Sequence, residues 1–357
     1  MSPIIYLEAL KSRLISFRTL QDELTIRDMP TALGWTLLLK KYEETEGNIQ
    51  YRERWTSNLE DIYLNHIKYN SKVVYIYELS ADIAYKLQSK LNILVSDESR
   101  FKDTFPLPVN EKDLKDSSFN PDIFEIETEG EDIRLFSSYK RAFRTRDEIQ
   151  YSQFNGEKTS NALIETLNKY EEVYGLRTDY AQAIDCIILR SNKNRMEFHI
   201  DNSHDILLEE VAKVANYYKD RINKFIQKEF EINECLNTAI NFYPKIKKLY
   251  EDADGQVTDY GHVTSSASVK HERMKRGIYD LRNEPFHQGG LAAVTTDGYS
   301  ITKKWKTEGK KILPSLSISG RFSIAGQLDA NIDFILINDC HSQNDFDMML
   351  NKLFENA

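Results

Sequence analysis

The chain has 357 residues, of which 41% are hydrophobic and 29% are charged, proportions that are typical of a globular protein. A chain of this length is expected to form about two domains and can bury a full core without disulfide staples. The formal net charge of −9 excludes a protein coated in positive charge, such as a histone-like binder, but not a local nucleic-acid site.

The first half of the chain is expected to alternate helices with a few strands. Leu7, Leu10, Leu14 and Phe17 recur at helical spacing, and Pro30 suits the first turn of a second helix. The elements expected next are a helix capped at Ser57, a strand over 73–77, a helix over 81–91 capped by Ser80, and a connecting region over 97–132 that holds a short strand (123–126) and an acidic, solvated run.

The middle of the chain carries the clearest patterns. A helix is expected after Ser160, and two β-rich runs, 184–190 and 195–200, flank a turn sequence and predict a hairpin. Apolar residues then step by three or four from Leu207 to Phe225, which predicts a long amphipathic helix.

The last third is expected to form a compact unit of short elements. A helix is predicted over 232–250, and a hairpin is predicted around a turn at 296–299. Strands are predicted over 312–318, 321–324 and 332–337, and a terminal helix is predicted from Asn344 or Asp345.

These elements predict an α+β fold built from two lobes. The first lobe, residues 1–230, is expected to be rich in helices, with a small mixed sheet and the long amphipathic helix. The second, residues 231–357, is expected to be a smaller α+β lobe that contains a basic segment over 264–312.

The basic segment 264–312 is the most unusual feature of the sequence. It holds ten basic and five acidic residues, so it carries +5 while the rest of the chain carries −14. Such an island can bind a phosphate backbone and steer a polyanion toward one face, and interleaved aromatic residues could stack on bases. The candidate nucleic-acid contacts are Lys270, Arg273, Lys275, Arg276, Arg282, Lys303, Lys304 and Lys306. An acidic protein partner and a plain solvated surface are the alternatives.

Two histidines of this segment are candidate catalytic residues. His271 and His287 lie beside carboxylates and basic residues, and histidine can act as a general acid or base while arginine or lysine stabilises a phosphoryl transition state. The alternative is that His287, next to Gly289 and Gly290, is a turn or packing element.

The predicted hairpin offers a second catalytic candidate. Asp185 on one strand and Glu197 on the next resemble the metal-binding strands of restriction-type nucleases, which would imply Mg²⁺ and hydrolysis of a phosphodiester. The chain departs from that pattern because His199 stands where a lysine is expected. A polar sheet face is the alternative interpretation.

Other chemistry is not indicated. The motifs of P-loop NTPases, dinucleotide-binding folds, serine hydrolases and zinc proteases are absent from the sequence, and no cofactor or metal site is evident. The three cysteines show no metal-site or paired spacing, and Cys186 is expected to be a buried thiol in a reducing cytoplasm. No run approaches the roughly 20 apolar residues that span a bilayer.

We therefore interpret the chain as a cytoplasmic, nucleic-acid-binding or acidic-partner-binding component of a prokaryotic multi-protein system, with phage defence as one setting. A nuclease and a non-catalytic assembly subunit are the alternatives. Other protein subunits are the expected partners, and homo-oligomers are allowed.

Overall fold

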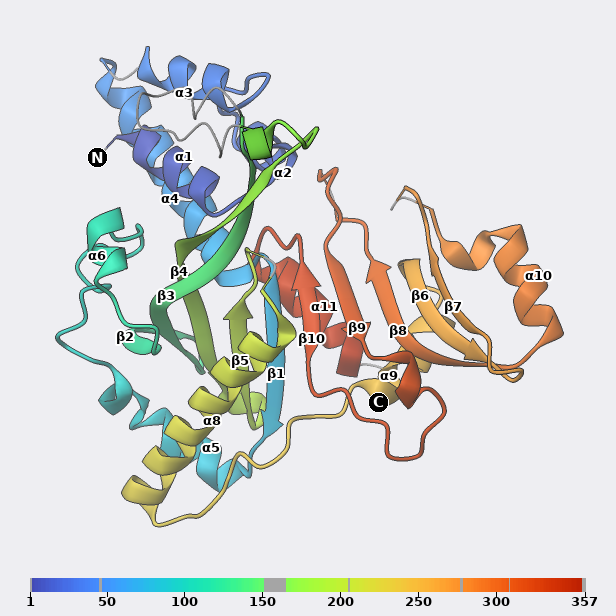
Figure 1. The fold of residues 1–357 in the computed structure, drawn as a ribbon. Coiled ribbons are helices and arrows are strands. Elements are labelled where there is room, and N and C mark those ends of the chain that lie inside the picture. Colours follow the sequence, from blue (N-terminus) through green and yellow to red (C-terminus); the bar gives the residue numbers. More distant parts are fainter. Residues whose placement is uncertain are drawn as a thin grey trace.

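The computed structural model describes residues 2–44, 47–150, 165–204, 206–276, 279–307 and 309–354 (Figure 1). In this part of the chain, ten strands form one antiparallel sheet with the order β2-β3-β4-β5-β1-β10-β9-β8-β6-β7. The strands are β1 (Lys72–Glu78), β2 (Asp122–Glu129), β3 (Asp132–Glu148), β4 (Tyr174–Arg190), β5 (Arg195–Asp201), β6 (Gln256–Thr264), β7 (Val269–Arg273), β8 (Thr296–Lys304), β9 (Ser315–Ser319) and β10 (Ile335–Asn338).

The α+β class is confirmed, but the expected helix-rich N-terminal lobe with a small mixed sheet is wrong. β1 pairs with β5 on one side and with β10 on the other, so a single large sheet continues from the N-terminal part of the chain into the C-terminal part. Both partners of β1 lie more than a hundred residues further along the chain, which is why no local pattern could reveal them. The domain boundary at residue 230 stays a prediction.

Helices cover both faces of this sheet (Figure 1). They are α1 (Pro3–Ser12), α2 (Phe17–Ile26), α3 (Trp35–Glu43), α4 (Ile49–Tyr69), α5 (Ala81–Gln88), α6 (Glu111–Lys115), α8 (Leu208–Phe230), α9 (Tyr243–Glu251), α10 (Pro285–Ala293) and α11 (Gln343–Phe354). The strand at 73–77, the helix after Ser80, the hairpin formed by β4 and β5, the long helix α8 and the terminal helix α11 are confirmed.

Several element boundaries were predicted wrongly. The helix α4 begins at Ile49 after an Asn48 cap, so Ser57 lies inside it, and α3 begins at Trp35 rather than at Pro30. The strand predicted over 321–324 is wrong, because Phe322–Ile324 form a turn of 3-10 helix, and β8 runs straight through the expected turn at 296–299. The helix predicted over 232–250 shrinks to α9, and the cap predicted at Ser160 lies outside the described residues.

Alternation along β1 separates the two faces of the sheet. Val73, Tyr75 and Tyr77 pack under α5 and α8, whereas Val74 and Ile76 pack on the other face with α9 and α11. Helices α1 and α4 cover that second face further along, over β3 and β4. Because side chains alternate between the faces of a strand, each row of paired residues can be followed across the whole sheet.

Candidate functional site

A polar face lies on the α8 side of the sheet, beyond β10. A row is a line of paired residues that crosses neighbouring strands on one face of the sheet. The row that begins with Val73 under α8 continues through Leu336, and the residues beyond Leu336 are polar. It runs on through Ser317, Thr302, Asp259 and Arg273, and the next row holds Asn338, Ser315, Lys304 and Gln256. We call the residues of these two rows from β10 to β7, apart from Leu336, the polar face.

The polar face forms one wall of a cleft of about 410 Å³, here called the central cleft. Residues of the turn between α1 and α2 and of the C-terminal end of α4 also line this cleft. The lining side chains are largely hydroxyls and amides, with Ser16, Thr19, Asn70, Ser71, Asn202, Ser203, Thr258, Thr302, Ser315, Ser317 and Asn338 among them. Hydroxyl and amide groups of this kind donate hydrogen bonds to phosphate and sugar oxygens in nucleic-acid complexes.

Three of the predicted nucleic-acid contacts meet at this cleft and at the hollow that adjoins it. Arg273 and Lys304 line it, and both also line an adjoining hollow of about 310 Å³ together with Lys275. Arg273 comes from β7, Lys304 comes from β8, and Lys275 follows β7 directly. Among the described residues, no carboxylate lies within ion-pair distance of Lys275 or Lys304, and the carboxylate nearest to Arg273 is 3.9 Å away.

A hydrogen-bonded aspartate and histidine lie beside Arg273. The Nε2 atom of His271 is 2.7 Å from Oδ1 of Asp259, and the Nε atom of Arg273 approaches the other oxygen of that carboxylate. His271 is 56% exposed at its side chain, whereas Asp259 is only 19% exposed. The sequence-predicted candidate His271 is therefore solvent-accessible and oriented by a carboxylate, as a general base usually is.

A second aspartate of the cleft is unusual. Asp339 follows β10 with a φ of 60°, in the left-handed region, and its backbone N–H donates to Asn70. Burial raises the pKa of Asp339, and the positive charge of Lys304 offsets part of that effect. A carboxyl group with a raised pKa in a polar cleft is a candidate functional group.

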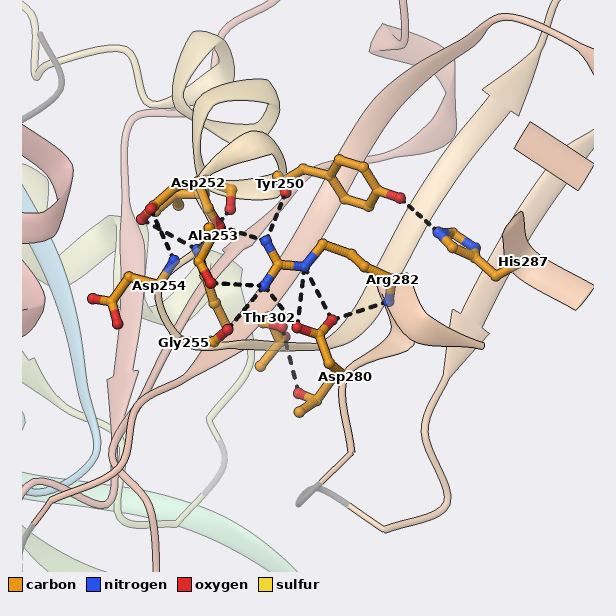
Figure 2. A network of polar contacts seen from close by, with 12 residues as sticks. Tyr250, Asp252, Ala253, Asp254, Gly255, Asp280, Arg282, His287 and Thr302 are labelled. Carbon is orange, nitrogen blue, oxygen red and sulfur yellow. Dashed lines mark hydrogen bonds and ion pairs between the residues drawn. The ribbon is translucent and has the colours of Figure 1, made fainter. Parts of the chain in front are cut away.

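Two other predicted contacts, Arg282 and Lys303, are used inside the protein, and Figure 2 shows the partners of Arg282. Arg282 donates from Nη1 to the carbonyl of Tyr250 at 3.1 Å and from Nη2 to that of Gly255 at 2.8 Å, and it pairs with Asp280. Lys303 is buried and donates to the carbonyl of Leu249 at 2.9 Å. Both cations therefore cap the C-terminal end of α9, where positive charge is favourable.

The remaining predicted cations are spread around the edge of the sheet. Lys270 and Arg276 are exposed, but alternation along β7 places Lys270 on the face opposite to His271 and Arg273. Lys306 lines a separate cleft of about 600 Å³ between α11 and the ends of β6 and β8. The structure thus gathers part of the predicted set at the central cleft and leaves these three outside it.

The candidate His287 lies on the other face of the sheet and is buried. Its Nδ1 atom is 2.5 Å from Glu272, and its Nε2 atom is 2.8 Å from the hydroxyl of Tyr250, which Figure 2 shows beside the α9 cap. These contacts hold α10 against β7 and α9. His287 and His271 therefore do not share a site.

The candidates Asp185 and Glu197 are also buried, and they do not meet. Asp185 accepts hydrogen bonds from the backbone N–H of Asp201 and from the hydroxyl of Tyr218. Glu197 accepts from Arg195 at 2.6 Å and from Arg190 at 3.2 Å, and it contacts His199 at 2.9 Å. Both carboxylates are buried and hydrogen-bonded to other groups of the protein, so the hairpin presents neither of them to a substrate.

The central residues missed by sequence reasoning are Thr258, Asp259, Asp339 and the serines of β9. A signal for the serines was present, because Ser315, Ser317 and Ser319 alternate with Leu316 and Ile318. That period of two indicates a strand with one apolar and one small polar face. Asp259 and Asp339 carried no such signal, since they meet the other cleft residues only through the sheet order.

Comparisons with protein-family models and with curated proteins found no match. Among the described residues, no group of three or more His, Cys, Asp or Glu side chains is placed to hold a metal ion. No helix in the described part of the chain is long and apolar enough to cross a membrane. Cys186 is a buried free thiol, as expected.

Proposed function

We propose that the protein binds the phosphodiester backbone of a nucleic acid at the central cleft. The observation that carries this proposal is the convergence of Arg273, Lys275 and Lys304 on Thr258, at the mouth of a cleft rich in hydroxyl groups. Arginine, lysine and hydroxyl side chains are the groups that contact phosphate and sugar in protein–nucleic-acid complexes.

The charge around the cleft supports an anionic ligand. Arg276 is exposed and follows Lys275 directly in the chain, whereas Asp259 is shared between His271 and Arg273. The other strongly basic group that lines the central cleft, Arg13, is neutralised by Asp201 at 2.6 Å. An acidic overall chain with one basic cleft would direct a polyanion to that cleft and repel it elsewhere.

The lining favours backbone contacts over base recognition. No Phe, Tyr or Trp is among the described residues that line the central cleft, so stacking platforms of the kind that grip single-stranded bases are not built into it. We therefore expect affinity to depend strongly on salt and weakly on base sequence.

The test is binding of fluorescein-labelled 30-nucleotide DNA and RNA, single- and double-stranded, measured by fluorescence anisotropy in 50 mM salt. The double variant Arg273→Glu, Lys275→Glu should bind at least tenfold more weakly than the wild type, because it replaces two phosphate contacts with two repulsive charges.

The matched control is Lys224→Glu with Lys228→Glu, which makes the same charge change on exposed residues of α8. This control should bind within about twofold of the wild type if local contacts dominate over net charge. Equal affinity of the cleft variant and the wild type would refute the proposal. Tighter binding of a poly-glutamate peptide than of any nucleic acid would favour the acidic protein partner instead.

A second candidate function, phosphodiester hydrolysis, rests on the pair formed by His271 and Asp259. In such a reaction His271 would take a proton from the attacking water, Asp259 would orient the imidazole, and Arg273 would stabilise the charge that develops on the phosphate. Any Mg²⁺ requirement stays a prediction and is included in the assay.

This candidate predicts that His271→Ala abolishes cleavage while binding remains within about twofold, because the substitution removes no phosphate contact. Cleavage of labelled DNA and RNA is followed on denaturing gels with Mg²⁺, with Mn²⁺ and with EDTA. The control is His287→Asn, whose site is buried on the other face. Intact substrates under all conditions, or equal cleavage by His271→Ala, would exclude this chemistry.

Membership of a multi-protein system, as in phage defence, stays a prediction. Light scattering of the protein with and without the product of a neighbouring gene would test it, since a stable assembly raises the measured mass. The same measurement on the isolated protein tests the homo-oligomer.

A further inference from the structure

A larger cleft lies in the N-terminal part of the molecule, on the other side of Arg13. Its volume is about 850 Å³, in the upper part of the range of roughly 300–1,000 Å³ that is usual for ligand pockets. Helix α1, the segment 103–109 with the start of α6, Phe143 of β3 and residues 180–182 of β4 are parts of its walls. We call it the N-terminal cleft.

The walls of the N-terminal cleft are mainly apolar. Phe105, Leu107, Phe143 and Tyr180 line it and are only partly buried, and Ile5 of α1 is 42% exposed. Side chains of this kind lower the free energy of the system when a partner covers them. Together they provide a recessed apolar surface contributed by four separate segments of the chain.

The rim of the cleft is acidic, and most of its charge is not neutralised. Glu8, Glu60 and Asp103 line the cleft, and no lysine or arginine of the described chain lies within ion-pair distance of them. Burial raises the pKa of Tyr6 to about 12, and the hydrogen bond that Glu60 accepts from Tyr6 adds to this effect. The combined negative charge of Glu8, Glu60 and Asp103 favours a cationic ligand.

The other charged groups of the cleft are already paired. Arg13 donates to Asp201 at 2.6 Å and also to the carbonyl of Gln182. Glu111 pairs with Lys115 at 2.6 Å, and the ring of His204 lies 4.8 Å from that of Phe143. Glu111 is therefore unlike the other three carboxylates, since its charge is neutralised within its own helix.

We propose that the N-terminal cleft docks a segment of a partner protein in which lysine or arginine residues alternate with leucine, isoleucine or phenylalanine. The apolar side chains of the segment would enter between Phe105, Leu107 and Tyr180. Its cations would reach Glu8 and Asp103 at the rim. The acidic rim would therefore favour a positively charged segment, and the apolar walls would favour one that also carries apolar side chains. This site is independent of nucleic-acid binding at the central cleft.

The probe is a fluorescein-labelled synthetic peptide of alternating leucine and lysine, titrated with the full-length protein and followed by anisotropy. Glu8→Lys with Asp103→Lys should weaken binding at least tenfold. The matched control, Glu209→Lys with Asp220→Lys, makes the same change in net charge on exposed residues of α8 and should bind within about twofold of the wild type.

Two results would overturn the proposal. The first is an equal loss of affinity in the cleft variant and in the α8 variant, which would show that only net charge matters. The second is equal affinity for a serine–lysine peptide of the same length, which would show that the apolar walls take no part. Tenfold weaker binding of the serine–lysine peptide, together with loss only in the cleft variant, would support it.

Discussion

Replacing Glu197 with alanine should lower the free energy of unfolding by about 3–5 kcal/mol, because it takes the carboxylate partner from buried Arg195 and one of three such partners from buried Arg190. Glu197 is fully buried on β5 and accepts hydrogen bonds from Arg190 and Arg195. Burial by itself would raise the pKa of Glu197, but Arg190, His199 and Arg195 together lower it strongly. Chemical denaturation at pH 7 measures the loss.

The same network predicts a dependence on acid. Since the pKa of Glu197 is lower in the folded protein than its ordinary value of 4.5, its contribution is complete above that pH and is lost as the pH falls further. Glu197→Gln should flatten this part of the stability profile. Wild-type stability in Glu197→Ala, with loss confined to a cleavage assay, would contradict the structural role and restore the catalytic one.

Replacing Asp201 with alanine should be comparably severe, again by about 3–5 kcal/mol. Asp201 is buried at the end of β5, pairs with Arg13 at 2.6 Å, and accepts from the backbone N–H of Ile184 at 3.0 Å. Burial opposes its charge, yet Arg13, Lys72 and Arg141 hold the pKa of Asp201 well below its usual range. The substitution would remove the carboxylate that pairs with Arg13 and would leave Asp185, 3.8 Å from Arg141, to face the buried cations.

Urea denaturation of Asp201→Ala should be compared with that of Asp220→Ala, which changes an exposed aspartate of α8. The control should stay within about 0.5 kcal/mol of the wild type, as surface substitutions usually do. A loss below about 1 kcal/mol for Asp201→Ala would show that the buried cations find other partners or lose their protons.

The helices and strands with strong local periodicity could be predicted from the sequence, and the architecture could not. The apolar steps from Val211 to Phe225 define α8, and the turn formers at 191–194 define the hairpin of β4 and β5. By contrast, β1 pairs with β10 across more than 250 residues of chain. Such a pairing leaves no pattern in the local spacing of residues, so the sequence predicted two lobes where the structure has one continuous sheet.

The candidate site, like the fold, could be predicted only in part from the sequence. The basic segment 264–312 contains Arg273, Lys275 and Lys304, which line the hollow beside the central cleft, but the sequence could not separate these from Arg282 and Lys303, which cap α9. A count of charged residues does not distinguish an exposed cation from one whose N–H groups donate hydrogen bonds to backbone carbonyls. The same limit applies to Glu197, whose alternation on β5 fitted both a catalytic and a structural carboxylate.

The most direct test of the central claim is the salt dependence of DNA binding by the wild type and by the triple variant Arg273→Gln, Lys275→Gln, Lys304→Gln. Each phosphate contact contributes roughly 0.7–0.9 to the slope of log K against log salt. Neutralising these cations should therefore reduce the magnitude of the slope by about 2–3. An unchanged slope in the triple variant would contradict phosphate binding at the central cleft.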